Sequence, residues 1–296
     1  MYSGHVACPG CGAVIAMKFA LSAMGPKTAI VMPACCWGVI SGSYPQTALK
    51  VPVMHTAFAS AGATAAGLRA ALDARGQRDT AVMVWAGDGG TFDIGLQALS
   101  GAVERNEDFI YVCYDNEAYM NTGVQRSSAT PFGMRTTTTP GEGWKKDRKK
   151  NIMEIMAAHG IPYAATADIA FPEDMIRKFK KARDLKGGSR FIHVFAACPT
   201  GWKFPSDRTI AFSRLAVKTN IFPLYEIEGG VRYTLNYRGG LPVKSYLKGQ
   251  GRFAHLTDED VRHIQRMVDE QWDALMQKIM SAHPEMADSL HFGIGR

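Results

Sequence analysis

The chain has 296 residues, of which 46% are hydrophobic, and a formal net charge of +7 at pH 7. This length is typical of one large α/β domain or two small ones, and the apolar content supports a substantial core. Long apolar runs and the basic, then apolar, start of a signal peptide are absent, so we expect a cytoplasmic protein without a membrane span. The basic residues are spread out and lack interleaved aromatic residues, so we expect no nucleic-acid partner.

Near the beginning of the chain, Cys8 and Cys11 form a C-x-x-C turn before a predicted helix at 13–24. Two thiolates on one turn can bind zinc or an iron–sulfur cluster, and a thioredoxin-type redox pair is a third alternative. A zinc ribbon would need a second C-x-x-C, which this sequence lacks. The remaining candidates are an adjacent pair, Cys35 and Cys36, and the lone Cys198, and two close ligands plus two distant single ones fit a [4Fe–4S] cluster. Without a secretion signal, a disulfide framework is disfavoured.

The next segments alternate between strand and helix patterns. We expect a strand at 28–32, a loop at 35–38, a short apolar segment at 51–55 and a helix at 57–74. His55 is expected in core or loop structure. The helix contains small residues at helical spacing, which allow close packing on a neighbouring helix. They are Ala61, Gly62, Ala65 and Gly67.

A βαβ unit is predicted around a glycine-rich turn. An apolar run at 80–86 reads as a buried strand that leads into Gly87-Asp88-Gly89-Gly90, and a second strand at 109–114 ends before Asn116. The helix between these strands has its apolar positions at Ile94, Leu96, Leu99 and Val103.

Ligands bind at the carboxyl ends of such strands, where Asp88 and Asn116 would both lie. One carboxylate and one amide oxygen beside a helix N-terminus suit Mg²⁺ that bridges a diphosphate. The glycine spacing matches neither a Rossmann fingerprint nor a P-loop. The alternative interpretation is an acidic turn followed by an Asx turn.

A polar, glycine-containing loop follows Asn116, and functional residues concentrate in such loops. Asn121 could hydrogen-bond a substrate carboxylate or carbonyl, or it could be a satisfied turn residue. Residues 136–139 look extended. The densest basic cluster, at 145–150, is interpreted as a solvated face or as a surface for an acidic partner such as a ferredoxin-like domain.

The alternating pattern continues with a helix at 151–159, a strand at 163–166, a helix at 173–184 and a strand at 191–195. We therefore predict an α/β domain at 1–202, with a largely parallel sheet flanked by helices. Residues 203–296 are predicted to form an irregular C-terminal extension. It carries one long amphipathic helix at 258–282 and packs on the domain or on partner subunits.

Taken together, four motifs resemble the β subunit of 2-oxoacid:ferredoxin oxidoreductases, which include pyruvate and 2-oxoisovalerate synthases. The resemblance covers nearly the whole chain. The motifs are Cys-Pro-Gly-Cys-Gly at 8–12, Gly-Asp-Gly-Gly-Thr-Phe-Asp-Ile-Gly-Leu-Gln at 87–97, Tyr-Asp-Asn-Glu-Ala-Tyr-Met-Asn-Thr-Gly at 114–123 and Ala-Cys-Pro-Thr-Gly-Trp at 197–202.

The resemblance implies a thiamine diphosphate (ThDP)-binding fold. It implies that Mg²⁺ is held by Asp88, Asn116 and the backbone carbonyl of Ala118, and that Asn121 faces the substrate as a catalytic residue. The implied cofactor-binding residues are Gly87, Asp88, Gly89, Gly90, Asn116, Ala118, Tyr119, Asn121 and Thr122. The implied [4Fe–4S] ligands are Cys8, Cys11, Cys36 and Cys198. Cys35 is then a bystander, and Cys113 belongs to the core.

The resemblance further implies oxidative decarboxylation of a 2-oxoacid during anaerobic metabolism. ThDP is the electron sink for loss of CO₂, electrons pass through the cluster to ferredoxin or another acceptor, and coenzyme A receives the acyl group. An α subunit would complete the ThDP site, so the chain would be inactive alone. The γ and δ subunits, which are ferredoxin-like, would be further partners.

This sequence departs from the family pattern in two places. Ala59 and Ser60 replace a common Glu and Asn, and Cys35-Cys36-Trp37-Gly38 replaces Gly-Cys-Leu-Glu. These departures suggest an acyl pocket for a branched or aromatic 2-oxoacid, such as 2-oxoisovalerate or phenylglyoxylate, or for oxalate. Two other classes are a cluster-free ThDP decarboxylase or synthase and a non-catalytic zinc-binding interaction subunit. Iron and thiamine analysis would separate these classes.

Overall fold

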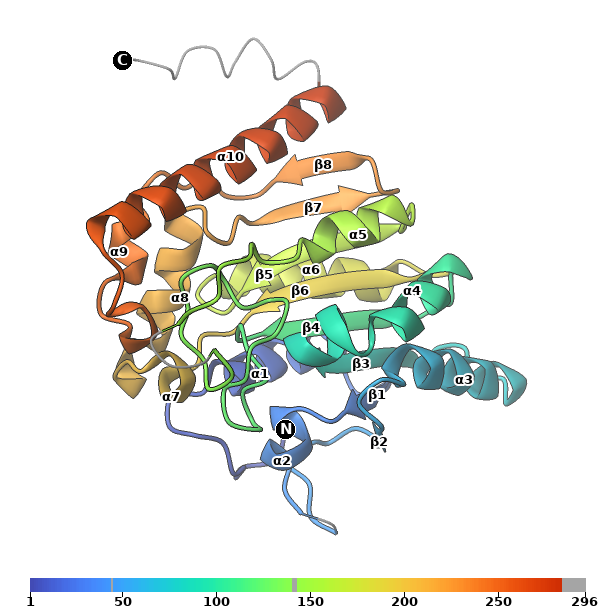
Figure 1. Ribbon diagram of the computed structural model, residues 1–296. Helices are drawn as coiled ribbons and strands as arrows, with labels where there is room; N and C mark the ends of the chain where they lie inside the picture. Colours follow the sequence, from blue (N-terminus) through green and yellow to red (C-terminus); the bar gives the residue numbers. More distant parts are fainter. Residues whose placement is uncertain (44, 140–142, 284–296) are drawn as a thin grey trace.

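The described part of the chain has eight strands in one sheet, in the order β2-β1-β3-β4-β6-β5-β7-β8 (Figure 1). The computed structural model describes residues 1–43, 45–139 and 143–283. Along this order, every neighbouring pair from β2 through β6 to β5 is parallel. β7 runs antiparallel to both of its neighbours, β5 and β8. The strands are β1 (Thr28–Pro33), β2 (Val53–Thr56), β3 (Ala81–Gly87), β4 (Ile110–Asp115), β5 (Tyr163–Asp168), β6 (Arg190–Phe195), β7 (Tyr225–Glu228) and β8 (Arg232–Leu235).

Helices cover both faces of the sheet, which confirms the predicted α/β fold with a largely parallel sheet. On one face, α1 (Gly12–Met24) and α6 (Pro172–Asp184) pack on side chains such as Trp85. The opposite face, which includes Tyr111, is covered by α3 (Ala61–Ala74), α4 (Leu96–Glu104), α5 (Ile152–Ala158) and α10 (Asp258–Ala282). Because the central strands are buried on both faces, their sequences are nearly continuous apolar runs.

Close packing of α3 on α4 depends on one of the small residues. A Cβ atom at Gly62 would lie 2.5 Å from the main-chain oxygen of Ala98, so only glycine fits there. Ala61 and Ala65 are also buried, as expected for this face. Gly67 is exposed, and a Cβ atom added there meets nothing within 4 Å. The predicted role in packing therefore holds for Gly62 and fails for Gly67.

Four local predictions are wrong. The expected loop after Cys35 is a short helix, α2 (Cys36–Ile40), which Cys35 caps in an extended conformation. The stretch expected to be extended at 136–139 is a turn closed by threonine hydroxyls, in which Thr136 N–H donates to Thr139 Oγ1 at 2.8 Å. Ile94 is 56% exposed because a π-helix at Gly89–Asp93 precedes α4 and shifts the helical register. His55 is exposed on β2 and is not a core residue.

The segment after residue 202 is more regular than predicted. It contains α8 (Thr209–Lys218), α9 (Lys244–Leu247), the β7–β8 hairpin, and the short helices η2 (Ser206–Arg208) and η3 (Gly251–Phe253). A further short helix, α7 (Pro199–Trp202), ends directly before this segment. Pairing of β7 with β5 adds this segment to the same sheet, as Figure 1 shows. The predicted helix at 258–282 is present as α10 and begins with a capping box formed by Thr257 and Asp260. The division of the chain at residue 202 stays a prediction. No helix among the described residues combines the length and the apolar content of a membrane span.

The contrast between Gly62 and Gly67 gives a paired test of the α3–α4 contact. We expect Gly62→Ala to lower the free energy of unfolding by about 1–3 kcal/mol, since the methyl group overlaps the α4 backbone. Gly67→Ala should raise it by about 0.5–1 kcal/mol, since alanine favours an exposed helix interior. Denaturant unfolding of both variants measures these changes. Equal stability of the two variants would contradict the close contact.

Candidate functional site

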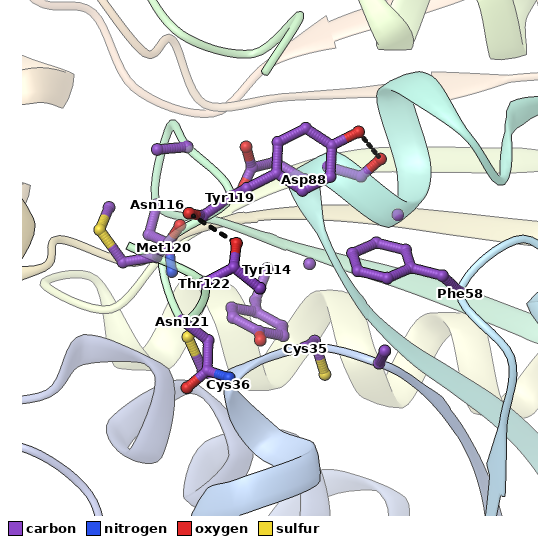
Figure 2. Close-up of a pocket in the computed structure, with 15 residues that line it drawn as sticks. Cys35, Cys36, Phe58, Asp88, Tyr114, Asn116, Tyr119, Met120, Asn121 and Thr122 are labelled. Carbon is purple, nitrogen blue, oxygen red and sulfur yellow. Dashed lines mark hydrogen bonds between the residues drawn. The ribbon is translucent and has the colours of Figure 1, made fainter. Parts of the chain in front are cut away.

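A pocket of about 70 Å³ lies at the carboxyl ends of β3 and β4 (Figure 2). Pairing of Gly87 with Tyr114 aligns these two strands, so the residues that follow each strand meet at one edge of the sheet. All nine residues that the sequence assigned to cofactor binding line this pocket. They are Gly87, Asp88, Gly89, Gly90, Asn116, Ala118, Tyr119, Asn121 and Thr122.

Two glycines allow aromatic side chains to approach the backbone of the pocket. A Cβ atom at Gly89 would lie 2.3 Å from the ring of Tyr119, and one at Gly90 would lie 3.2 Å from the ring of Phe58. The Tyr119 hydroxyl donates a hydrogen bond to the Gly89 carbonyl at 3.2 Å. The rings of Phe58 and Tyr119 lie 5.7 Å apart and form a wall of the pocket (Figure 2).

Three residues bring polar atoms together where Mg²⁺ was expected. One terminal atom of the Asn116 carboxamide lies 3.1 Å from Asp88 Oδ1 and 3.0 Å from the main-chain oxygen of Ala118. If this atom is nitrogen, it donates to both oxygens; if it is oxygen, three oxygens converge. Adjacent ligands of octahedral Mg²⁺, with bonds of about 2.1 Å, lie about 3.0 Å apart. These three groups therefore fit a magnesium ion with the amide oxygen facing inward.

The electrostatics of Asp88 agree with a cation site. Burial and the nearby Asp115 carboxylate raise the pKa of Asp88 well above its usual value, while the Ser127 hydroxyl opposes this shift. Ser127 donates to Asp88 Oδ2 at 2.6 Å. A divalent cation at Oδ1 would favour the ionised carboxylate and would offset its burial.

The four predicted cluster cysteines lie at turns and helix starts that meet near this pocket. Cys11 caps α1, Cys36 begins α2 and Cys198 caps α7. Backbone N–H groups at helix starts favour negative charge, including that of a thiolate. The Cys8–Cys11 turn is held against the segment around Cys198. There Gly12 N–H donates to the Ala197 carbonyl at 3.3 Å.

The cysteine pKa values show that these thiols interact. Burial raises the pKa of Cys36 to about 12, and the thiols of Cys35, Cys198 and Cys11 add to the rise. Burial raises the pKa of Cys198 to about 11, and the thiols of Cys11 and Cys8 raise it further, whereas the hydrogen bond from Gly201 N–H lowers it. Over residues 1–43, 45–139 and 143–283, however, no three Cys, His, Asp or Glu side chains are arranged to hold a metal ion. The cluster ligands therefore stay a prediction that rests on proximity.

Two residues at which this chain departs from the family pattern lie outside the pocket, whereas several unpredicted residues line it. Trp37 is fully buried, donates to the Ala13 carbonyl at 3.0 Å and does not line the pocket. Ala59 does not line it either, so the proposed direct effect of these departures on an acyl pocket lacks support. Cys35, expected to be a bystander, does line the pocket. Cys113 is buried in β4, as predicted. The sequence analysis missed the pocket residues Ala34, Phe58, Tyr114 and Met120.

Three lysines of the basic cluster, Lys145, Lys149 and Lys150, are directed inward, which corrects the interpretation of the cluster as a solvated face. Lys145 donates to the carbonyls of Ser128 and Thr130 at 3.2 and 2.5 Å, and burial lowers the pKa of Lys145 to about 8. Lys150 donates to the Phe92 carbonyl. These buried acceptors could not be predicted from local sequence, because they lie 15 residues or more from the lysines along the chain.

Lys149 occupies the centre of a buried charge network beside the pocket. Its Nζ lies 2.6 Å from Asp115 Oδ2 and 3.1 Å from Glu117 Oε1. His193 Nε2 lies 2.8 Å from the same oxygen of Asp115. Burial alone would raise the pKa of Asp115, but Lys149 and His193 lower it below its usual value. Asp115 is therefore ionised directly before the proposed cation ligand Asn116.

Comparison with known proteins now identifies the family. The family described as "Thiamine pyrophosphate enzyme, C-terminal TPP binding domain" matches residues 35–194. The ketoisovalerate oxidoreductase subunit VorB of Pyrococcus furiosus is 51% identical over 286 residues, which cover 93% of this chain and 91% of that protein. The chain belongs to the β-subunit family of 2-oxoacid:ferredoxin oxidoreductases.

A second relative has about the same sequence identity to this chain, and a solved structure shares its fold. The pyruvate synthase subunit PorB of Methanocaldococcus jannaschii is 52% identical over 279 residues, which cover 90% of this chain and 93% of that protein. A solved structure, the 2-oxoglutarate:ferredoxin oxidoreductase from Magnetococcus marinus with 2-oxoglutarate, coenzyme A and succinyl-CoA bound, has 21% identity and a TM-score of 0.58. The match covers 89% of this chain and 93% of that one. That structure shares the fold.

Removal of the Lys149 charge tests the network beside the pocket. We expect Lys149→Met to lower the free energy of unfolding by about 3–5 kcal/mol at pH 7, because two buried carboxylates lose their shared counter-charge. The loss should shrink towards pH 4, where the freed Asp115 carboxylate accepts a proton. Lys146→Met, in the same cluster but exposed, should change stability by no more than about 0.5 kcal/mol. Similar effects of both substitutions would contradict the network.

Proposed function

We propose that this chain supplies the Mg²⁺–ThDP and [4Fe–4S] sites of a heteromeric, cytoplasmic 2-oxoacid:ferredoxin oxidoreductase. One observation supports this most directly: Cys36 lines the same pocket as Asp88, Asn116 and Ala118. A cluster bound there would lie beside the cofactor and would receive its electrons over a short path.

The residues of the pocket divide into three roles. Asp88, Asn116 and the Ala118 carbonyl hold the cation that anchors the diphosphate. ThDP, when bound, supplies the electron sink for loss of CO₂ from the 2-oxoacid. Phe58 and Tyr119 cover one side of the site and exclude water. Asn121 lines the pocket with an exposed side chain, where its carboxamide can orient the 2-oxo or carboxylate group.

The four thiolates of Cys8, Cys11, Cys36 and Cys198 bind the cluster. The positions of Cys11, Cys36 and Cys198 at helix starts favour the negative charge of these ligands. Electrons then leave through ferredoxin-like γ and δ subunits to ferredoxin or another acceptor, and coenzyme A receives the acyl group.

Partner contacts are expected beside the pocket. Val39, Met54 and Ile94 are 53%, 51% and 56% exposed and belong to α2, β2 and the turn after the π-helix, near segments that carry pocket residues. Large exposed apolar side chains are typical of protein interfaces. We assign them to contact with an α subunit that completes the ThDP site. The substrate class is a small aliphatic 2-oxoacid, pyruvate or 2-oxoisovalerate. A 2-oxoacid panel that includes phenylglyoxylate and oxalate tests this choice.

The cation site is tested by Asp88→Asn in the anaerobically purified complex. We expect Mg²⁺-dependent ThDP binding, measured by calorimetry, to fall at least tenfold, because a charged ligand of a hard cation is lost. Asp79→Asn is the control, since Asp79 is exposed and paired with Lys27. Wild-type ThDP affinity in Asp88→Asn would contradict the assignment.

The cluster is tested by Cys198→Ser. We expect iron content and the cluster's paramagnetic resonance signal to decrease, while Cys35→Ala, adjacent to a proposed ligand, should keep both. Iron retained in full after Cys198→Ser would contradict the ligand set. Thiamine without any iron in the wild-type chain would select the cluster-free class. Zinc without thiamine would select the zinc-binding class.

A further inference from the structure

Arg252 is a buried arginine in the C-terminal segment, and its guanidinium is fixed by contacts on every side. It is 1% exposed and lies 3.6 Å from the ring centroid of Trp202. Its Nη2 donates to the Tyr246 hydroxyl at 2.7 Å, and its Nε donates to Gln250 Oε1 at 2.9 Å. Its Nη1 lies 2.7 Å from Glu117 Oε2. These contacts hold the guanidinium in one orientation.

Glu117 stands between two of the proposed cation ligands. It adopts φ 68°, a left-handed conformation that is unfavourable for a residue with a Cβ atom. Its carboxylate is 98% buried and pairs with Arg252 and Lys149, whereas the Asn116 carboxamide lies between Asp88 Oδ1 and the main-chain oxygen of Ala118. The ion pairs thus stabilise the backbone conformation that brings the two flanking oxygens together.

Trp202 provides a second connection between Arg252 and the same ligands. The indole Nε1 of Trp202 donates to the main-chain oxygen of Asn116 at 2.8 Å. Arg252 stacks on that indole, so its guanidinium restrains Asn116 through Trp202 and restrains Glu117 directly. Glu117 Oε2 accepts no hydrogen bond from the described residues, so its contact with Arg252 Nη1 is a close charge pair. A lysine would keep that charge but would lack the guanidinium plane that stacks on the indole.

We propose that Arg252 is a positioning residue for the cofactor cation, acting through Glu117 and Trp202 on the Asn116 and Ala118 oxygens. This inference rests on the proposed function, because it concerns the Mg²⁺–ThDP site of the preceding section. Arg252 itself contacts neither proposed ligand group of the cation in the described structure.

The test is a Mg²⁺ titration of ThDP binding to the complete complex, with Arg252→Met, Arg252→Lys and wild type compared by calorimetry. Partners that orient metal ligands typically change metal affinity about 10–100-fold when they are removed. We therefore expect Arg252→Met to need at least tenfold more Mg²⁺ for half-saturation. Arg252→Lys keeps the charge but loses the planar contact, so it should show an intermediate shift. Excess Mg²⁺ should restore full ThDP binding, which would not occur after general misfolding.

The control is Arg238→Met, an exposed arginine of the same segment, which should behave like wild type. If Arg252→Met does not assemble, Trp202→Phe decides, since it keeps a smaller aromatic ring at this position and removes the N–H that binds Asn116. A raised Mg²⁺ requirement of Trp202→Phe supports the inference, and wild-type affinity overturns it. Wild-type Mg²⁺ affinity in an assembled Arg252→Met complex also overturns it. If the wild-type complex itself binds no ThDP, the proposed function fails instead.

Discussion

Buried negative charge at the carboxyl ends of β3 and β4 is the constraint on which the site depends. Asp88, Asp115 and Glu117 are each 2% exposed or less. Buried carboxylates without a counter-charge are strongly destabilising, so each must be protonated, paired or bound to a cation. Asp115 and Glu117 are paired with Lys149, and Glu117 is also paired with Arg252. Asp88 has no ion pair among the described residues, and it is the carboxylate that the proposed cation would neutralise.

This distribution of charge explains why distant parts of the chain meet here. Lys149 comes from the long loop after β4, and Arg252 comes from the segment after β8. Both must reach the same edge of the sheet for Asp115 and Glu117 to be buried. The C-terminal segment is therefore part of the site, since it supplies a counter-charge and the residues around it. Trp202, in one of the cysteine motifs, connects that segment to the backbone of Asn116.

Local patterns in the sequence were enough to predict the central βαβ unit and to place Asp88 and Asn116 at the ends of its strands. The apolar runs of β3 and β4 are buried on both faces. Between them, a Cβ atom at Gly89 would clash with the ring of Tyr119, which explains a glycine there. The helix at 258–282 was equally clear, because its periodicity is long and its start is capped. Resemblance to a family then supplied roles for residues that local patterns only placed at strand ends.

The failures at the basic cluster, at β7 and at Arg252 share one physical cause, which is that a residue's partner lies far away in the sequence. The lysines at 145–150 looked solvated because their acceptors lie on other elements. β7 looked irregular because it is short and contains Glu226, which is buried and paired with Arg177 and Lys181 of α6. Arg252 gave no signal at all, since an isolated arginine in a polar stretch is usually exposed.

Anomalous diffraction at the iron edge from anaerobic crystals of the ThDP-loaded complex tests the central claim most directly. Our account predicts an iron peak enclosed by the sulfur atoms of Cys8, Cys11, Cys36 and Cys198. It also predicts a diphosphate-bound cation in contact with Asp88, Asn116 and the Ala118 oxygen, on the other side of the same pocket. Iron elsewhere, or a diphosphate that does not approach Asp88, would contradict it.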